Sequence, residues 1–343
     1  MTAGPDSRLV ALETWLAGIE TVGGGRPVPA SEDASFRRYF RVVCGDESYV
    51  VMDAPPPAED CRPFVRVAGD LAAMGLNAPR VIASDVEQGF LLLTDLGTSE
   101  YLNVLRQSPD RADVLYADAL DALATMHARG RPMQHRLPAY DEALLRFELS
   151  LFHDWLCGRH LGIELTRAEA RHWQALCDAL VDNALAQPRV YVHRDYHSRN
   201  LMLTEVDNPG ILDFQDAVEG PLTYDLVSLL KDCYLRWPDE RVDAWMRGFY
   251  DRMQPEIRKR VAADEFARYF ELMGVQRHLK AAGIFARLCH RDGKSGYLGD
   301  VPRTLSYIVT LADRQPSLCH PSLDFLTELI VTRVLPGLEA DAT

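Results

Sequence analysis

Two short segments of the chain carry side chains whose types and spacing suit the transfer of a phosphoryl group. Residues 193–200 read His-Arg-Asp-Tyr-His-Ser-Arg-Asn, and Asp213, thirteen residues after Asn200, ends a short apolar run. Phosphoryl transfer needs a carboxylate beside the attacking hydroxyl and oxygen ligands that hold Mg²⁺ against the phosphates. Asp195 has the chemistry to accept or orient the hydroxyl proton, and Asn200 and Asp213 have the chemistry to bind the metal. Their order and spacing predict a magnesium-dependent phosphotransferase.

Two other patterns give weaker indications. His193 and His197 are four residues apart, as in zinc-binding helices, but the intervening residues and the loop context do not fit that motif. Gly293-Lys294-Ser295 resembles the end of a phosphate-binding loop, yet that motif needs a glycine where Leu288 stands. We therefore expect no zinc site, and a structural His193 whose ring donates to the backbone.

The composition limits the class of protein and its partners. The chain has 343 residues, 47% hydrophobic and 25% charged, with a net charge of −13. These values predict a soluble globular protein and argue against nucleic acid or an anionic membrane as a partner. No signal peptide and no membrane-spanning run is evident, and the seven cysteines are scattered. Such cysteines are typical of reduced thiols, so we expect a cytoplasmic location.

Apolar periodicity predicts a change of secondary structure along the chain. Residues 7–20 read as a helix, and alternating strand patterns follow a glycine-rich break at 23–25; beyond residue 97 helical patterns dominate. The predicted strands are 36–43, 48–52, 80–84, 90–94, 190–193, 201–203 and 210–212. The predicted later helices are 61–75, 110–129, 141–157, 166–186, 222–235, 239–252, 262–290 and 303–334, the last interrupted near Pro316.

This order of elements predicts an α+β protein with two lobes. Residues 1–96 would form a small, strand-rich, nucleotide-binding lobe, and residues 97–343 a large helical lobe with the catalytic loop and the acceptor site. The candidate catalytic residues would lie on loops between short strands. A cleft between lobes is where such loops would meet a nucleotide.

With these motifs in place, the chain resembles the aminoglycoside phosphotransferase family, which has a protein-kinase-like fold. Residues 193–200, 211–216 and 220–225 carry the resemblance. Within the family it is most similar to the group that phosphorylates the anomeric hydroxyl of N-acetylmuramate and N-acetylglucosamine in bacterial peptidoglycan recycling. The segments that indicate this group are 33–41, 51–56, 276–280 and 283–288.

The resemblance implies ATP and Mg²⁺ as cofactors and assigns roles to particular residues. Asp195 would be the catalytic base, and Asn200 and Asp213 the magnesium ligands. The loop over the phosphates would include Ser35, Phe36, Arg37 and Arg38, and the segment beside adenine would include Thr94, Asp95 and Leu96.

One departure from the family concerns the phosphates. Kinases hold the α- and β-phosphates with a strand lysine, but this chain has no lysine before Lys231 and Met52 occupies the corresponding position. We expect Arg37, Arg38 or Arg41 to replace it, because a guanidinium is always charged and binds phosphate through a planar fork. The missing lysine also leaves open a non-catalytic pseudokinase that only binds nucleotide.

The acceptor is suggested by a local excess of positive charge. Residues 271–300 contain five basic and three acidic side chains, and Lys280, Arg287, Arg291 and Lys294 recur at intervals of 7, 4 and 3, which predicts one helical face. Such a face favours an anionic sugar whose carboxylate pairs with arginine, with Arg287 and Arg291 as candidates. The alternative is a solvated helix face. Glu219 would instead hold sugar hydroxyls or an amide.

The short segment after Asp213 limits the remaining alternatives. Only ten residues separate Asp213 from Tyr224, which leaves little room for the activation segment of a protein kinase and favours a small-molecule acceptor. We expect Asp225 to brace the catalytic loop and the protein to be a monomer. An aminoglycoside kinase and a choline- or homoserine-type kinase remain as alternatives to the amino-sugar kinase.

Overall fold

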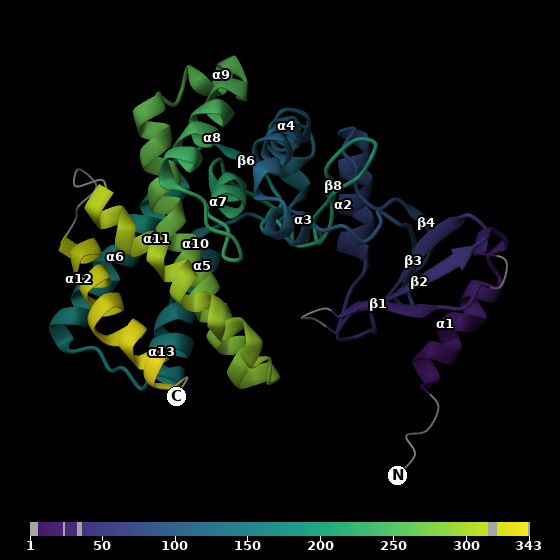
Figure 1. Cartoon of the computed structure of the whole chain (residues 1–343), viewed down its shortest axis with the longest axis horizontal. Coiled ribbons are helices and arrows are strands. Elements are labelled where there is room, and N and C mark those ends of the chain that lie inside the picture. Colours follow the sequence, from purple (N-terminus) through teal and green to yellow (C-terminus); the bar gives the residue numbers. More distant parts are fainter. Residues whose placement is uncertain (1–5, 23–24, 33–35, 315–320, 342–343) are drawn as a thin grey trace, which may run out of the picture. The chain divides into compact units, whose positions relative to one another are not determined.

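The structure is a computed structural model, and it describes residues 6–22, 25–32, 36–314 and 321–341 (Figure 1). The chain forms two compact units. The first consists of residues 1–100 together with 201–216, and the second of residues 101–200 together with 217–343. Among the described helices, none has the length and hydrophobicity that crossing a membrane requires.

The first unit is built on an antiparallel sheet of five strands in the order β1-β2-β3-β5-β4. One face of the sheet packs against the N-terminal helix α1 (Ser7–Ala17), which Asp6 caps by accepting hydrogen bonds from the backbone N–H groups of Arg8 and Leu9. Leu12 and Leu16 of α1 belong to the apolar core on this face. The strands are β1 (Val28–Glu32), β2 (Arg38–Cys44), β3 (Glu47–Asp53), β4 (Val81–Asp85) and β5 (Phe90–Thr94).

The register of β2 and β3 decides which side chains share a face. Tyr39 pairs with Met52, and Arg38 pairs with Asp53. Since Phe40 and Val51 belong to the core beneath α1, strand alternation places Arg38 and Asp53 on the α1 face and Met52 on the opposite face. Met52 is fully buried there.

Residues 201–216 join the first unit through backbone hydrogen bonds and one aromatic contact. The segment forms a two-stranded ladder of β7 (Leu201–Met202) and β8 (Gly210–Ile211). The Ile211 N–H donates to the carbonyl of Asn77 over 2.7 Å. Phe214 packs on Phe64 of α2 (Arg62–Ala73), with ring centroids 4.6 Å apart.

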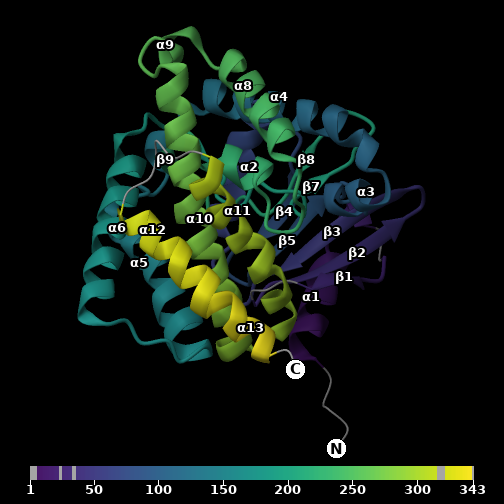
Figure 2. The same ribbon diagram turned by 60° about the vertical axis from the view of Figure 1, so that its left-hand side comes forward.

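The second unit is a helical bundle around the long helix α10 (Ala263–Asp292), which packs against α5, α6, α7, α8 and α11 (Figure 2). Gly283 allows a close approach, because a Cβ atom there would lie 2.3 Å from the backbone of Leu151. The remaining helices are α3 (Tyr101–Gln107), α4 (Ala112–Gly130), α5 (Glu142–Leu151), α6 (Arg167–Ala186), α7 (Tyr224–Leu230), α8 (Asp239–Arg252), α9 (Pro255–Arg258), α11 (Val301–Arg314), α12 (Pro321–Leu329) and α13 (Leu335–Asp341).

A small sheet in this unit supports the catalytic loop. β6 (Arg189–Val192) pairs antiparallel with β9 (Val218–Pro221), with Val192 opposite Val218. β9 was not predicted, because it is short and contains Gly220 and Pro221, which are both unfavourable in strands.

The predicted α+β class is confirmed, and most predicted elements agree with the structure within a few residues. Three helices differ. The helix predicted to end at 235 stops at Leu230, because Lys231 and Asp232 turn into buried contacts with Glu271 and Ser198. The helix predicted over 141–157 becomes a π-helix from Phe152 to His160. The long C-terminal helix is divided into α11, α12, a π-helical segment and α13, and the predicted break near Pro316 lies outside the described residues.

Candidate functional site

The catalytic loop begins where β6 ends, and Asp225 holds its first turn. The Asp225 carboxylate accepts hydrogen bonds from the backbone N–H of His193 over 2.6 Å and from that of Arg194 over 3.0 Å. Asp225 is fully buried at the start of α7. Arg194 has a positive φ of 80°, a strained conformation for a residue with a side chain. Asp225 therefore braces the loop, as the sequence predicted.

Asp195 presents a carboxylate that has no hydrogen-bond or ion-pair partner among the described residues. Only its backbone N–H is used, and it donates to Nδ1 of His193 over 3.2 Å. At Nδ1 the His193 ring thus accepts a hydrogen bond from the backbone N–H of Asp195. An unpartnered carboxylate on a strained loop is available to a substrate hydroxyl.

Nearby positive charges keep the Asp195 carboxylate ionised. Burial would raise its pKa, but Lys280, Arg277 and Arg194 lower that pKa to about 2. His197 adds no charge at neutral pH, because burial lowers its pKa to about 4. Asp195 is therefore an anion throughout the physiological range.

Asn200 closes the same loop. Its Nδ2 atom donates to the backbone carbonyl of Asp195 over 2.9 Å, and its backbone N–H donates to the carbonyl of His197 over 2.9 Å. Between them, Ser198 is held by Asp232, which accepts from both the backbone N–H and the hydroxyl of Ser198. The structure thus brings Asp195 and Asn200 together in one hydrogen-bonded loop.

A buried cluster around Glu148 supports this loop. The Glu148 carboxylate is 2% exposed. It accepts hydrogen bonds from Arg194 Nη2 over 2.6 Å and from Gln276 over 3.1 Å, and lies 3.2 Å from Lys280 Nζ. Lys280 also donates to the hydroxyl of Tyr224 over 2.7 Å. Sequence reasoning missed Glu148; its one signal was a carboxylate among the buried positions of an amphipathic helix.

The basic face predicted on α10 is not a single solvent-exposed face. Lys280 is buried against Glu148. Lys294 lies beyond the helix, which ends at Asp292 and is capped by Gly293 in the left-handed conformation. Arg291 is exposed and pairs with Asp292 over 2.8 Å. The face was predicted from helical spacing alone, which does not account for the end of the helix or for buried partners.

Two further candidates for acceptor binding also lie in the second unit. Arg287 is partly buried on α10, and its Nε atom has no hydrogen-bond partner among the described residues. Glu219 lies on β9, and one of its carboxylate oxygens accepts from Nε2 of Gln134 over 2.9 Å. The contacts thus give Glu219 a partner within the protein and leave the Nε atom of Arg287 without one.

Asp213 lies in the first unit, after β8. It has a positive φ of 60°, which an aspartate rarely adopts. One carboxylate oxygen accepts from Nε2 of Gln215 over 2.8 Å, and the same oxygen lies 3.9 Å from Nη2 of Arg37. The strained backbone and the neighbouring guanidinium are features that functional carboxylates often show.

The three arginines near the start of β2 have different surroundings. Arg38 lies on the α1 face, where it binds Asp53 over 2.6 Å. Arg41 binds Asp95 over 2.5 Å. Arg37 instead lies 3.7 Å from Glu59 and near Asp213, so among the three only Arg37 is close to a predicted magnesium ligand.

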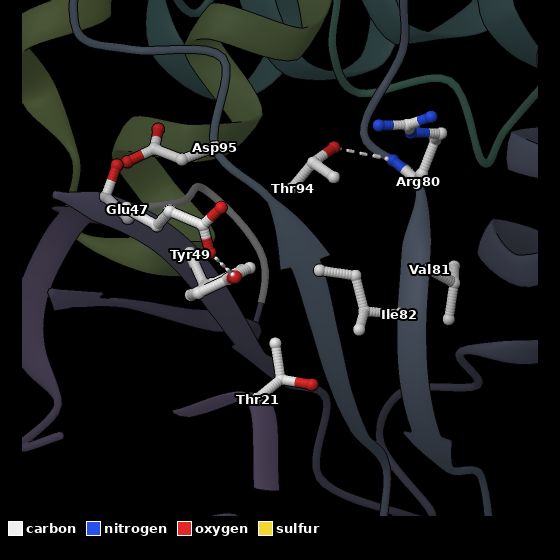
Figure 3. Close-up of a pocket in the computed structure, with 9 residues that line it drawn as sticks. Thr21, Glu47, Tyr49, Arg80, Val81, Ile82, Thr94 and Asp95 are labelled. Carbon is white, nitrogen blue, oxygen red and sulfur yellow. Dashed lines mark hydrogen bonds between the residues drawn. The ribbon is translucent and has the colours of Figure 1, made fainter. Parts of the chain in front are cut away.

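The residues predicted beside adenine are used partly within the protein. The Thr94 hydroxyl accepts from the backbone N–H of Arg80 over 2.9 Å, and Asp95 is bound to Arg41. Both line a hollow of about 620 Å³ at one end of the sheet, together with Tyr49 and Ile82 (Figure 3). Tyr49 belongs to the core beneath α1 and pairs with Thr94, so both side chains lie on the α1 face of the sheet. The hollow therefore adjoins the α1 face, and Met52 lies on the other face.

The other predicted nucleotide contacts are placed as follows. Leu96 lies against Gly210 of β8, where a Cβ atom would come within 2.9 Å of the leucine side chain. Phe36 is 72% exposed, and its backbone N–H donates to Glu59 over 3.2 Å. Ser35 lies outside the described residues.

Comparison with known proteins agrees with the chemistry of these loops. A family model described as the phosphotransferase enzyme family matches residues 27–260. The chain belongs to this family. An N-acetylmuramate/N-acetylglucosamine kinase of Pseudomonas aeruginosa is 52% identical over 326 residues, which cover 92% of this chain and 95% of that protein. The family predicted from the catalytic motif is thereby confirmed.

Solved structures support the fold. Plasmodium vivax ethanolamine kinase superposes with a TM-score of 0.64 at 9% identity, covering 94% of this chain and 90% of that one. The ADP-bound aminoglycoside phosphotransferase APH(2″)-Ib has a TM-score of 0.53 at 16% identity, covering 88% and 97%. At such low identity these similarities concern the fold alone, and they confirm the predicted kinase-like architecture.

Proposed function

We propose that the protein transfers the γ-phosphoryl group of ATP to the anomeric hydroxyl of N-acetylmuramate and N-acetylglucosamine, which gives the sugar 1-phosphates. The observation that carries the proposal is the unpartnered, ionised carboxylate of Asp195 on the braced loop. The acceptor is inferred from the Pseudomonas kinase, which is 52% identical along nearly its whole length. The reaction would belong to peptidoglycan recycling.

The principal role of Asp195 is to orient the acceptor. Its carboxylate accepts a hydrogen bond from the anomeric hydroxyl and aligns the oxygen with the γ-phosphorus. The bond from the sugar oxygen to phosphorus forms as the bond from phosphorus to the bridging oxygen of ADP breaks, and the hydroxyl proton passes late to the Asp195 carboxylate and from there to solvent water. A carboxylate with a pKa of about 2 is a weak base. Because the transition state for phosphoryl transfer is loose, orientation and charge matter more than early removal of the proton.

The chain provides oxygen atoms suited to Mg²⁺. Carboxylate and amide oxygens are the ligands this cation prefers, so Asn200 and Asp213 are the residues that would hold it. When bound, Mg²⁺ neutralises negative charge on the transferring phosphates. The reaction requires Asn200 and Asp213 to hold the Mg²⁺ of the nucleotide whose γ-phosphoryl group is attacked by the hydroxyl that Asp195 orients.

Contacts with the nucleotide come from the first unit. We assign the role of the missing lysine to Arg37, since Arg38 and Arg41 are bound to Asp53 and Asp95. The side chains of Thr94 and Asp95 are also bonded within the protein. Adenine would therefore be contacted by backbone groups of residues 94–96. We expect a monomer that acts in the cytoplasm, where ATP is present.

A coupled assay of ADP release tests the proposal. The acceptors are N-acetylmuramate, N-acetylglucosamine, kanamycin, choline and homoserine, each with ATP and Mg²⁺. We expect ADP only with the two amino sugars, and phosphorus NMR should identify the product as the 1-phosphate. Turnover with kanamycin, choline or homoserine but with neither sugar would overturn the proposed acceptor. Nucleotide binding without any turnover would indicate a pseudokinase.

The matched control is Asp195→Asn, which preserves the shape of the side chain and removes its charge. We expect kcat to fall by about 10²–10⁴-fold. The melting temperature should change by only a few degrees, because the carboxylate has no direct partner to lose. Near-normal turnover by this variant would show that Asp195 is not the residue that orients the acceptor.

A further inference from the structure

Arg277 is a buried cation with no carboxylate partner. It lies in the middle of α10 and is 5% exposed. Its Nη1 atom contacts Sγ of Cys233 at 3.6 Å, and its buried Nε atom has no hydrogen-bond partner. Among the described residues, no carboxylate oxygen lies within 4.0 Å of the guanidinium.

This arrangement is unfavourable for folding. A buried charge is normally paired, and an unsatisfied buried donor costs about 1–3 kcal/mol. The other buried cations that contact α10 follow the rule, since Lys280 pairs with Glu148 and Lys231 pairs with Glu271. The fold therefore retains Arg277 at a cost that the other two cations do not incur.

Arg277 lies beside the catalytic loop. Its partner Cys233 follows Asp232, which holds Ser198 of that loop. Its positive charge is among those that lower the pKa of Asp195. The contact with Cys233 and the hydrogen bonds from Ser198 to Asp232 thus place the guanidinium beside the loop that carries Asp195. No ion pair within 4.0 Å joins Arg277 and Asp195, so a small molecule could contact both groups.

We propose that Arg277 binds the carboxylate of the acceptor and thereby favours N-acetylmuramate over N-acetylglucosamine. The inference rests on the proposed function. The two sugars differ only in the lactyl ether that N-acetylmuramate carries. In this arrangement the anomeric hydroxyl lies on Asp195 and the lactyl carboxylate accepts hydrogen bonds from the guanidinium, which satisfies the unpaired charge.

Other basic side chains of the second unit fit this role less well. Lys280 is already neutralised by Glu148. Arg291 is paired with Asp292 and lies fourteen residues further along α10, about 21 Å at the rise of an α-helix. Arg199, within the catalytic loop, also lacks a carboxylate partner in the part of the chain that the structure describes, but its guanidinium lies over the rings of Tyr234 at 4.8 Å and Tyr297 at 5.7 Å.

The test compares two variants with the wild type on the two sugars. Arg277→Met removes the charge, and Arg277→Lys keeps the charge but loses the planar fork. We expect Arg277→Met to lower kcat/KM for N-acetylmuramate by about 10- to 100-fold, as for a charged hydrogen bond. The value for N-acetylglucosamine should change by less than about threefold, and Arg277→Lys should give an intermediate loss with N-acetylmuramate.

Stability provides a second readout, independent of catalysis. Replacing an unpaired buried charge with an apolar side chain is often neutral or stabilising. The melting temperature of Arg277→Met should therefore equal or exceed that of the wild type. A destabilised Arg277→Met protein together with unchanged sugar preference in Arg277→Lys would indicate a purely structural residue and overturn the inference.

Other outcomes separate this inference from the proposed function. Equal losses of kcat/KM with both sugars would overturn the inference and place Arg277 at the phosphoryl group or the loop. A loss selective for N-acetylmuramate in Arg199→Gln but not in Arg277→Met would overturn it too, and would move the carboxylate site to Arg199.

If the wild type turned over neither sugar, the proposed function would fail. Calorimetry with N-acetylmuramate would then decide the inference: binding abolished by Arg277→Met preserves it, and absence of binding to the wild type overturns it.

Discussion

The Nη2 atom of Arg37 lies 3.9 Å from the Oδ1 atom of Asp213. The same guanidinium lies 3.7 Å from Glu59, just before α2. Kinases place a strand lysine between a helix glutamate and the phosphates, and here Met52 at the strand position is apolar and fully buried. Arg37 thus places a positive charge near two carboxylates. One is Glu59, which lies just before α2, and the other is Asp213, the predicted magnesium ligand.

Arg37→Met tests whether this guanidinium replaces the lysine. We expect KM for ATP to rise by about tenfold or more, because a charged hydrogen bond to phosphate is worth about 1.5–3 kcal/mol. KM for the sugar should change little. Steady-state kinetics with ATP as the varied substrate measures the effect.

The control is Arg41→Met, because Arg41 lies on the neighbouring strand β2 and its guanidinium is already bound to Asp95. It should affect the melting temperature more than KM for ATP. A larger rise in KM for ATP with Arg41→Met than with Arg37→Met would show that Arg41, and not Arg37, contacts the phosphates.

The catalytic loop was predictable because its information is local. The spacing of Asp195 and Asn200 fixes both on one loop, and a carboxylate such as Asp225 at the start of the next helix is available to brace that loop. The kinase-like fold followed from the same motif together with the order of strands and helices. Neither conclusion depended on which distant side chains meet in the interior.

Features that depend on distant partners were not predictable. Helical spacing put Lys280 on one basic face with Arg287 and Arg291, but Lys280 is buried against Glu148, more than a hundred residues earlier. The sequence offers no reason to prefer one of Arg37, Arg38 and Arg41 as the phosphate ligand. The strand register shows that Arg38 lies opposite Asp53 and binds it, which distinguishes Arg38 from Arg37. β9 carries too weak a propensity to be recognised without its partner β6.

Glu148→Gln should destabilise the second unit. The change leaves the buried Lys280 and the partly buried Arg194 without their shared counter-ion, and removing one partner of a buried pair costs about 3–5 kcal/mol. Glu142→Gln, on the same helix but exposed and paired with Arg146, should change stability by less than about 1 kcal/mol. Urea unfolding of the two variants gives the comparison, and equal small effects would contradict a structural role for the Glu148 cluster.

The same carboxylate should make stability depend on acid. Burial would raise the pKa of Glu148, but Lys280 and Arg194 hold it below the usual value of 4.5. A carboxylate whose pKa is lowered in the folded state stabilises the fold above its unfolded pKa, and that contribution is lost as the pH falls. The free energy of unfolding of the wild type should therefore decrease below about pH 4.5, and this component should be absent in Glu148→Gln.

Asp213→Asn should raise the Mg²⁺ concentration needed for half-maximal activity by about tenfold or more, because a neutral amide is a weaker ligand for a hard cation. Asp216→Asn is the control, since Asp216 is exposed only three residues away. Titration of activity with Mg²⁺ at fixed ATP measures both variants. An unchanged Mg²⁺ requirement in Asp213→Asn would exclude Asp213 as a metal ligand.

The pH profile should separate Asp195 of the catalytic loop from Asp225, which braces that loop from α7. Asp195, with a pKa of about 2, stays ionised from pH 5 to 8 and should produce no acidic limb in that range. Burial raises the pKa of Asp225 to about 6, so its carboxyl becomes protonated below that pH and accepts more weakly from the N–H groups of His193 and Arg194. We expect kcat/KM to fall below about pH 6 in the wild type. Asp225→Asn should show lower activity without this limb, and a limb near pH 6 that persists in Asp225→Asn would assign the titration to another group.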